Sequence, residues 1–168
     1  DPEQAPRLVT EALNGKPVLR FDGVDDYLEM ANDTSLQPLS GDWTVFFVGK
    51  RNEGSQGDFP QVIGSRPWVA GLDAGWSVAF NGASGVLGSH YADGGAGHDV
   101  PQVASSTPLS LEAFQVWQVE ENRGLGTTAF AVGGVIDRLL STPMPVAAIE
   151  QAEAIAIGRE MGGSNTRR

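Results

Sequence analysis

The chain contains no cysteine, and this absence excludes disulfide bonds, thiolate metal sites and a cysteine nucleophile. It also has no apolar run that approaches the roughly 20 residues of a membrane-spanning helix, so we expect no membrane insertion. Basic residues are few: 11 Lys and Arg stand against 21 Asp and Glu, which gives a formal net charge of −10. Because such a negative field repels phosphate groups, nucleic acid is not an expected partner.

Turn-forming residues are abundant, with 22 Gly and 10 Pro among 168 residues, and this content favours short strands over a helix bundle. Hydrophobic residues make up 40% of the chain, which is enough for one domain with its own core. The pair Gly133-Gly134 and the NGAS stretch after Phe80 predict two tight hairpin turns. The one helical candidate, Pro145 to Glu153, is short. We therefore predict an all-β fold, a two-sheet antiparallel β-sandwich. Alternating apolar and polar residues place its strands at 17–21, 26–30, 43–51, 75–82, 85–91, 114–122, 127–141 (two strands) and 153–160.

The stretch VLRFDGVDDYLEM, from Val18 to Met30, places three Asp residues and a Gly between two predicted strands. Calcium takes about six to eight oxygen ligands, and Asp22, Asp25 and Asp26 can supply part of such a shell. The alternative is a solvated turn in which the Asp side chains accept hydrogen bonds from nearby backbone N–H groups. The sequence leaves both interpretations open, with a structural calcium ion as the candidate cofactor.

The loop SHYADGGAGHDV brings together His90, Tyr91, Asp93 and His98. Imidazole and carboxylate groups suit transition metals, but the spacing matches no zinc motif, and a plain polar loop at one end of the sandwich is the simpler interpretation. The same mixture of an aromatic ring and polar groups also lines sugar sites. We therefore take these four residues as candidate ligand-binding residues.

Four tryptophans are the other candidates for stacking against a sugar ring. Trp43 and Trp117 lie in strongly alternating strand patterns, and we expect them in the core. Trp68 follows an Arg-Pro pair and Trp76 follows the turn-like LDAG, so we expect these two nearer the surface. Trp68 and Trp76 therefore join the candidate ligand-binding residues.

Catalytic motifs are weak in this sequence. A retaining glycosidase needs two carboxyl groups about 5–5.5 Å apart, and no run of alternating carboxylates supplies them. Glu120 and Glu121 are adjacent, so they face opposite sides of a strand. A lyase would use His90 or His98 with Tyr91 for proton transfer, but His90 and Tyr91 would also face opposite sides of a strand. No G-x-S-x-G elbow and no phosphate-binding loop are present, so we predict no catalytic residue.

The segments NGKPVLRFDGVDDYLEM and SGDWTVFFVGKR resemble the opening of a laminin G-like jelly roll, within the concanavalin A-like lectin/glucanase superfamily. GTTAFAVGGVI resembles the late hairpin of that family, and EAIAIGRE resembles its penultimate strand. The resemblance covers Leu13 to Glu160. It departs at both ends, because the first and last strands of the family have no counterpart in residues 1–168. We therefore expect a single domain that is either a fragment of a longer protein or a trimmed one, with an open sheet edge through which it can self-associate.

This resemblance implies a non-catalytic carbohydrate-binding or adhesion module of an exported bacterial protein, placed outside the cell or on its surface. A calcium ion near the FDGVDDY motif is also implied. The same superfamily contains glycoside hydrolases and polysaccharide lyases, so an enzyme is the first alternative. The second alternative is a structural assembly module of a multidomain surface protein.

Overall fold

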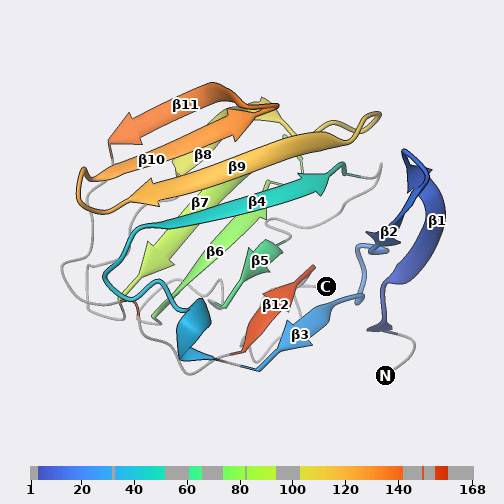
Figure 1. The fold of residues 1–168 in the computed structure, drawn as a ribbon, viewed down its shortest axis with the longest axis horizontal. Helices are drawn as coiled ribbons and strands as arrows, with labels where there is room; N and C mark the ends of the chain where they lie inside the picture. Colours follow the sequence, from blue (N-terminus) through green and yellow to red (C-terminus); the bar gives the residue numbers. More distant parts are fainter. Residues whose placement is uncertain are drawn as a thin grey trace.

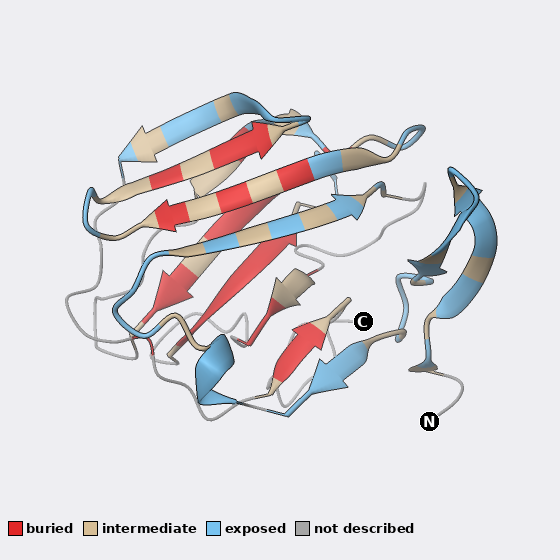
Figure 2. Ribbon diagram, viewed as in Figure 1, coloured by how far each residue is buried: buried red, intermediate tan, exposed pale blue. Residues whose placement is uncertain are grey.

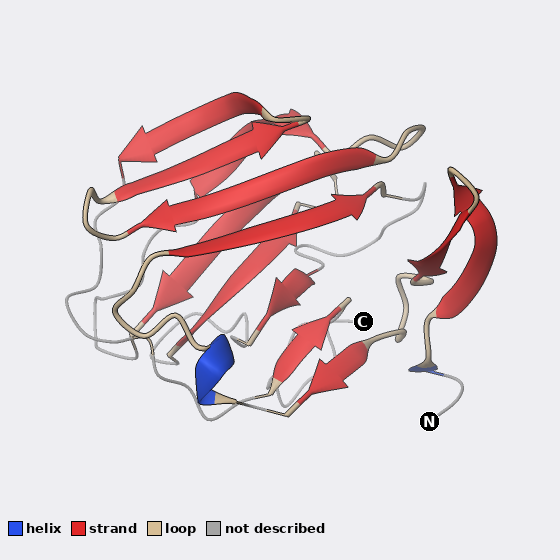
Figure 3. Ribbon diagram, in the orientation of Figure 1, coloured by secondary structure: helices blue, strands red, loops and turns tan. Residues whose placement is uncertain are grey.

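A computed structural model describes residues 4–31, 33–51, 61–65, 74–81, 83–93, 103–141, 149 and 154–158. Apart from short 3-10 turns such as η2 (Thr34–Leu36), these residues form strands and the turns between them (Figure 3). The described part contains no helix long and apolar enough to cross a membrane. The strands are β1 (Arg7–Leu13), β2 (Lys16–Arg20), β3 (Leu28–Met30), β4 (Trp43–Gly49), β5 (Gln61–Gly64), β6 (Gly75–Phe80), β7 (Val86–Ala92), β8 (Val103–Pro108), β9 (Gln115–Asn122), β10 (Thr127–Val132), β11 (Val135–Ser141) and β12 (Ile155–Ile157).

Two antiparallel sheets form the body of the molecule (Figure 1). One has four strands in the order β11-β10-β9-β4, and the other has six in the order β3-β12-β5-β6-β7-β8. The sheets stack with the core between them, because residues from both contribute to one hydrophobic cluster. The predicted all-β antiparallel sandwich is therefore confirmed. A third element, the hairpin of β1 and β2, forms a separate two-stranded sheet at one side.

The core takes its largest side chains from alternate positions of facing strands. Trp117 and Phe130 come from β9 and β10, and Val78 and Leu87 come from β6 and β7. The strand segments that carry these side chains appear as red bands on both sheets in Figure 2. Trp117 is fully buried, and Trp43 packs against the same cluster. Both tryptophans thus occupy the core positions that the sequence pattern predicts.

The two hairpin turns lie where the sequence predicts them. Gly133 and Gly134, with φ of 59° and 82°, connect β10 to β11, and this left-handed pair matches the right-handed twist of the strands that it joins. Asn81 Oδ1 accepts a hydrogen bond from the Ser84 backbone N–H (2.8 Å) in the turn between β6 and β7. Both predicted hairpins are confirmed.

Three strands lie outside the predicted set. β5 has only four residues, and β8 (VASSTP) is largely polar, so neither gives a clear alternating pattern. β1 (RLVTEAL) contains good helix formers, which conceals a strand that pairs, among the described strands, with β2 alone. The helix considered for 145–153 lies outside the described residues except for Ile149, which forms an isolated β-bridge with Leu39.

Among the described strands, β4 and β11 border the four-stranded sheet, and β3 and β8 border the six-stranded sheet. β4 has seven residues, and an edge strand of that length offers backbone groups to another strand. Self-association through such an edge remains a prediction.

Gly64 in β5 lies too close to β6 to accept a side chain. A Cβ at this position would be 2.7 Å from Cα of Ser77 and from the carbonyl oxygen of Trp76. Because backbone cannot move aside cheaply, we expect Gly64→Ala to lower the free energy of unfolding by about 1–3 kcal/mol. Urea denaturation measures this change. Gly124→Ala is the matched control, because the nearest atom to its Cβ, Asn122 Oδ1, is 3.6 Å away; an equal loss in both variants would contradict the packing argument.

Candidate functional site

The six-stranded sheet has a floor of small residues on the face turned away from the four-stranded sheet. Trp76 and Val78 of β6 point into the core, so Ser77 and Ala79 point the other way. Strand register then aligns their neighbours: Gly64 and His90 flank Ser77, and Gln61 and Gly88 flank Ala79. We call these six outward residues the small-residue floor: Gln61, Gly64, Ser77, Ala79, Gly88 and His90.

The floor is largely buried and partly polar. Ser77 and Ala79 have no exposed surface although they face outward, so β6 is buried on both of its faces. The Ser77 hydroxyl is buried and has no hydrogen-bond partner among the described residues. His90 beside it is half-buried. The floor thus gathers hydroxyl, imidazole and amide groups on a base of Gly and Ala, and His90 is its one member that is not buried.

The structure separates the predicted ligand-binding residues. His90 lies on the floor, whereas Tyr91, the next residue of β7, is fully buried in the core. The prediction that these neighbours face opposite sides is confirmed, and the two cannot serve one sugar together. Asp93, just after β7, is half-buried. Trp68 and His98 lie outside the described residues.

The prediction that Trp76 lies near the surface is wrong. Only 6% of it is exposed, and its ring centroid lies 5.2 Å from that of Trp43 in the opposite sheet. The LDAG stretch before it suggests a loop, but Trp76 is the second residue of β6, where the period of two turns it inward. Trp76 therefore does not form an exposed surface on which a sugar could stack.

Asp22, Asp25 and Asp26 lie together in the turn between β2 and β3, with one carboxylate oxygen from each within 4.8 Å of the others. Asp22 Oδ1 accepts hydrogen bonds from the backbone N–H groups of Val24 (2.8 Å), Asp25 (3.3 Å) and Asp26 (3.4 Å). These bonds, that from Val24 above all, lower the pKa of Asp22. They are the bonds of a solvated Asp turn, and the remaining oxygens fit only part of a calcium shell. A calcium ion here stays a prediction.

Glu121 is a buried carboxyl group that connects the two sheets. It lies in β9 beside Trp117 and Val119 on the inward face, whereas Glu120 points outward as predicted. Ser89 of β7 donates its hydroxyl to Glu121 Oε1 (2.5 Å), and Thr128 of β10 donates to Oε2 (2.7 Å). The sequence reading gives Glu121 no role. Glu121 comes two residues after Val119, in a strand whose alternate residues are apolar. This position is the sequence signal for a carboxyl group that points inward.

Burial raises the pKa of Glu121 to about 7, although hydrogen bonds from Ser89 and Thr128 and the charge of Arg123 act in the opposite direction. A raised carboxyl pKa is typical of general acids in catalytic sites. Glu121, however, has no exposed surface and faces the opposite sheet. It therefore contributes to the packing of the sandwich rather than to contact with a substrate.

Comparison with known proteins supports the fold alone. No model of a known protein family matches the chain, and no curated protein matches it. Solved structures do match: the carbohydrate-binding module CBM40 of the Ruminococcus gnavus IT-sialidase superposes with a TM-score of 0.55 at 9% identity, over 80% of this chain and 78% of that one. The chain has the sandwich fold of a CBM40 module. The same module bound to α2,6-sialyllactose (TM-score 0.54, 8% identity, 80% and 79% covered) and to α2,3-sialyllactose (0.54, 9%, 80% and 78%) gives equivalent matches.

The pKa of Glu121 predicts a pH dependence of stability. A folded-state pKa of about 7, above the ordinary value of 4.5, means that the protonated group stabilises the fold at low pH and that this contribution is lost as the pH rises through 7. The loss amounts to about 3 kcal/mol at most. We expect urea denaturation to give a lower free energy of unfolding at pH 8 than at pH 5, and Glu121→Gln to flatten this difference. Glu120→Gln, on the outward face of the same strand, is the control and should keep the wild-type slope.

Proposed function

We propose that this chain is a non-catalytic carbohydrate-binding module of an exported bacterial protein, which binds sugar at the small-residue floor. The observation that carries the proposal is the fold that it shares with the CBM40 module of the Ruminococcus gnavus IT-sialidase, two structures of which hold sialyllactose. The resemblance of the FDGVDDY motif to laminin G-like modules supports the same class of module. Its location outside the cell is part of the proposal.

The chemistry of the floor suits a sugar. Gly64, Ala79 and Gly88 are buried, and half-buried His90 is the floor residue that a sugar can reach. Ser77 has a hydroxyl with no described partner, and His90 lies opposite it in the same row. Hydroxyl-rich ligands are recognised by such groups, each of which gives one or two hydrogen bonds. Calcium, if it binds at Asp22, Asp25 and Asp26, would order the turn between β2 and β3 and would not contact the sugar there.

Charge favours a neutral sugar over a sialylated one. The chain carries a net charge of −10, and the six floor residues include no Lys or Arg. A carboxylate ligand would enter this field without a Lys or Arg among the six floor residues to pair with, at an energetic cost. We therefore propose neutral oligosaccharides as the ligand class, although the CBM40 structures hold sialyllactose.

A glycan array, run with calcium and again with EGTA, tests this proposal. We expect binding to neutral glycans over sialyllactose, and we expect His90→Ala and Ser77→Val to weaken binding by about tenfold or more, because each removes a hydrogen-bonding group. Thr44→Ala, on the outer face of the other sheet, is the control and should bind as wild type.

Loss of binding in EGTA would support the calcium site at the Asp turn, and unchanged binding would remove calcium from the proposal. Binding that survives both floor substitutions would place the site elsewhere. Binding to no glycan at all would overturn the proposed function.

A further inference from the structure

The outer face of the four-stranded sheet carries apolar side chains in register. Val48 of β4 lies opposite Val116 of β9. Directly paired residues form rows across the four strands. The next row starts at Phe46 of β4, crosses β9 and β10, and ends at Ile136 of β11. Leu139 of β11 ends the third row. We call these five residues the outer apolar patch: Phe46, Val48, Val116, Ile136 and Leu139.

These side chains are exposed to a degree that is unusual for a sheet face. Phe46 is 66% exposed, Val116 51%, and Ile136 and Leu139 63% each. The outer face of an antiparallel sheet is normally polar where it meets water, so exposed apolar side chains gathered on it mark an interaction surface. Gln118 and Glu120 of β9 lie among them. The patch lies on the face opposite to the core, on a different sheet from the small-residue floor.

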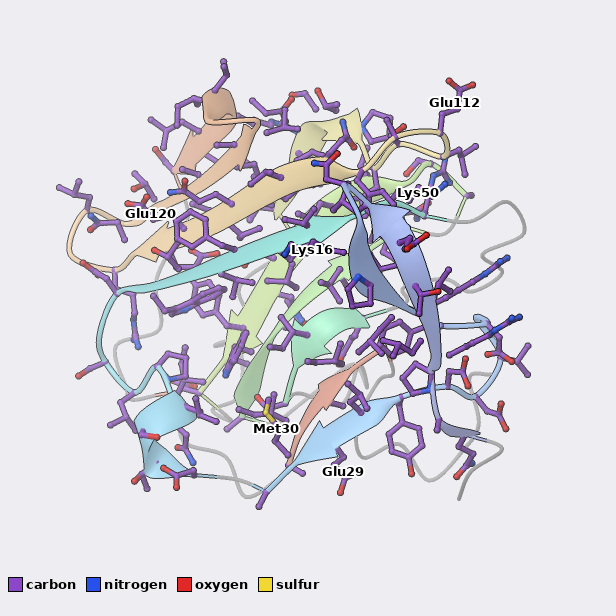
Figure 4. All side chains as sticks on the ribbon, turned by 45° about the vertical axis from the view of Figure 1, so that its right-hand side comes forward. Lys16, Glu29, Met30, Lys50, Glu112 and Glu120 are labelled. Atoms are coloured by element: carbon purple, nitrogen blue, oxygen red, sulfur yellow. The ribbon has the colours of Figure 1, made fainter. Side chains whose placement is uncertain are left out.

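Two opposite charges lie at the two ends of this patch. Lys50 directly follows β4, and its ammonium group lies over the ring of Phe114 with 5.6 Å to the ring centroid. Glu120 lies at the other end, opposite Thr44, and its Oε2 accepts a hydrogen bond from Gln118 (3.1 Å). Figure 4 shows Lys50 and Glu120 at opposite ends of the neighbouring strands β4 and β9.

We propose that the outer apolar patch is the interface of a symmetric dimer with a second copy of this chain. The two-fold axis would lie between the two facing sheets and run perpendicular to their strands. Rotation about this axis reverses the strand direction. It therefore places Lys50 of one copy over Glu120 of the other, twice in the dimer, while the apolar side chains meet at the centre. One surface patch thus pairs with itself, as in an isologous interface. The sheets would stack about 10 Å apart, as in other sandwiches.

The charge pattern favours a second copy over an unrelated partner. Lys50 and Glu120 lie at opposite ends of the patch, and a surface with this charge pattern is complementary to itself after reversal. Four strands about 4.8 Å apart and about 20 Å long give a small interface, at the low end for specific complexes. The net charge of −10 on each copy opposes association further. We therefore expect a weak dimer that forms at micromolar concentrations or above.

Sedimentation velocity across about 10 µM to 1 mM protein measures this equilibrium. Phe46→Ser, at the most exposed residue of the patch, should abolish the dimer. Lys50→Glu and Glu120→Lys each place like charges together at two symmetric positions, and each should weaken the dimer by about tenfold. The double variant Lys50→Glu/Glu120→Lys restores opposite charges and the wild-type net charge, and it should restore the dimer. Leu8→Ser, an exposed apolar residue of the β1–β2 hairpin at 60% exposure, is the control and should leave the dimer unchanged.

A monomer over the whole concentration range would overturn the proposal. The patch would then be a candidate binding surface for a partner other than a second copy. A dimer that survives Phe46→Ser would also overturn it and would point to pairing along an edge such as β4. A dimer that both single charge variants weaken but the double variant does not restore would contradict the reversed arrangement of the two copies. Circular dichroism of each variant confirms that loss of the dimer is not loss of the fold.

Discussion

The period of two along each strand is the constraint on which the rest of this structure depends. Successive side chains of a strand point to opposite faces, and the register between strands aligns them into rows. In β6 this rule turns Trp76 and Val78 inward and leaves Ser77 and Ala79 outward. In β4 it turns Val45 and Phe47 inward and leaves Phe46 and Val48 outward. The core, the floor and the outer patch are three results of one alternation.

The same rule explains what the sequence predicts well. Long strands with clear alternation, such as β4, β9 and β10, follow from their own residues, and the Gly133-Gly134 turn follows from the need for a left-handed backbone. The inward positions of Trp117 and Val119 follow as well. Adjacent residues such as His90 and Tyr91 are correctly separated because alternation requires no knowledge of the tertiary structure.

The candidate site is harder to predict from the sequence, because it depends on pairing between distant segments. Gly64, Ser77 and His90 become neighbours only when β5, β6 and β7 align, and no single segment shows the row. Trp76 is misjudged because the turn-like residues before it outweigh the alternation of a strand that begins one residue earlier. Glu121 is overlooked because a carboxyl group in a core is costly in general, and only the two hydroxyls of Ser89 and Thr128 make it acceptable.

The β1–β2 hairpin has a consequence for how the chain unfolds. Its two strands pair only with each other among the described strands, and Leu8 and Leu19 remain exposed. An isolated two-stranded hairpin is marginally stable in water, so its backbone amides should exchange with solvent through local opening. The amides of β9 and β10, between neighbours on both sides, are released only by opening of the whole sandwich. The chain thus contains two cooperative units of very different protection, and a single unfolding transition describes only the larger one.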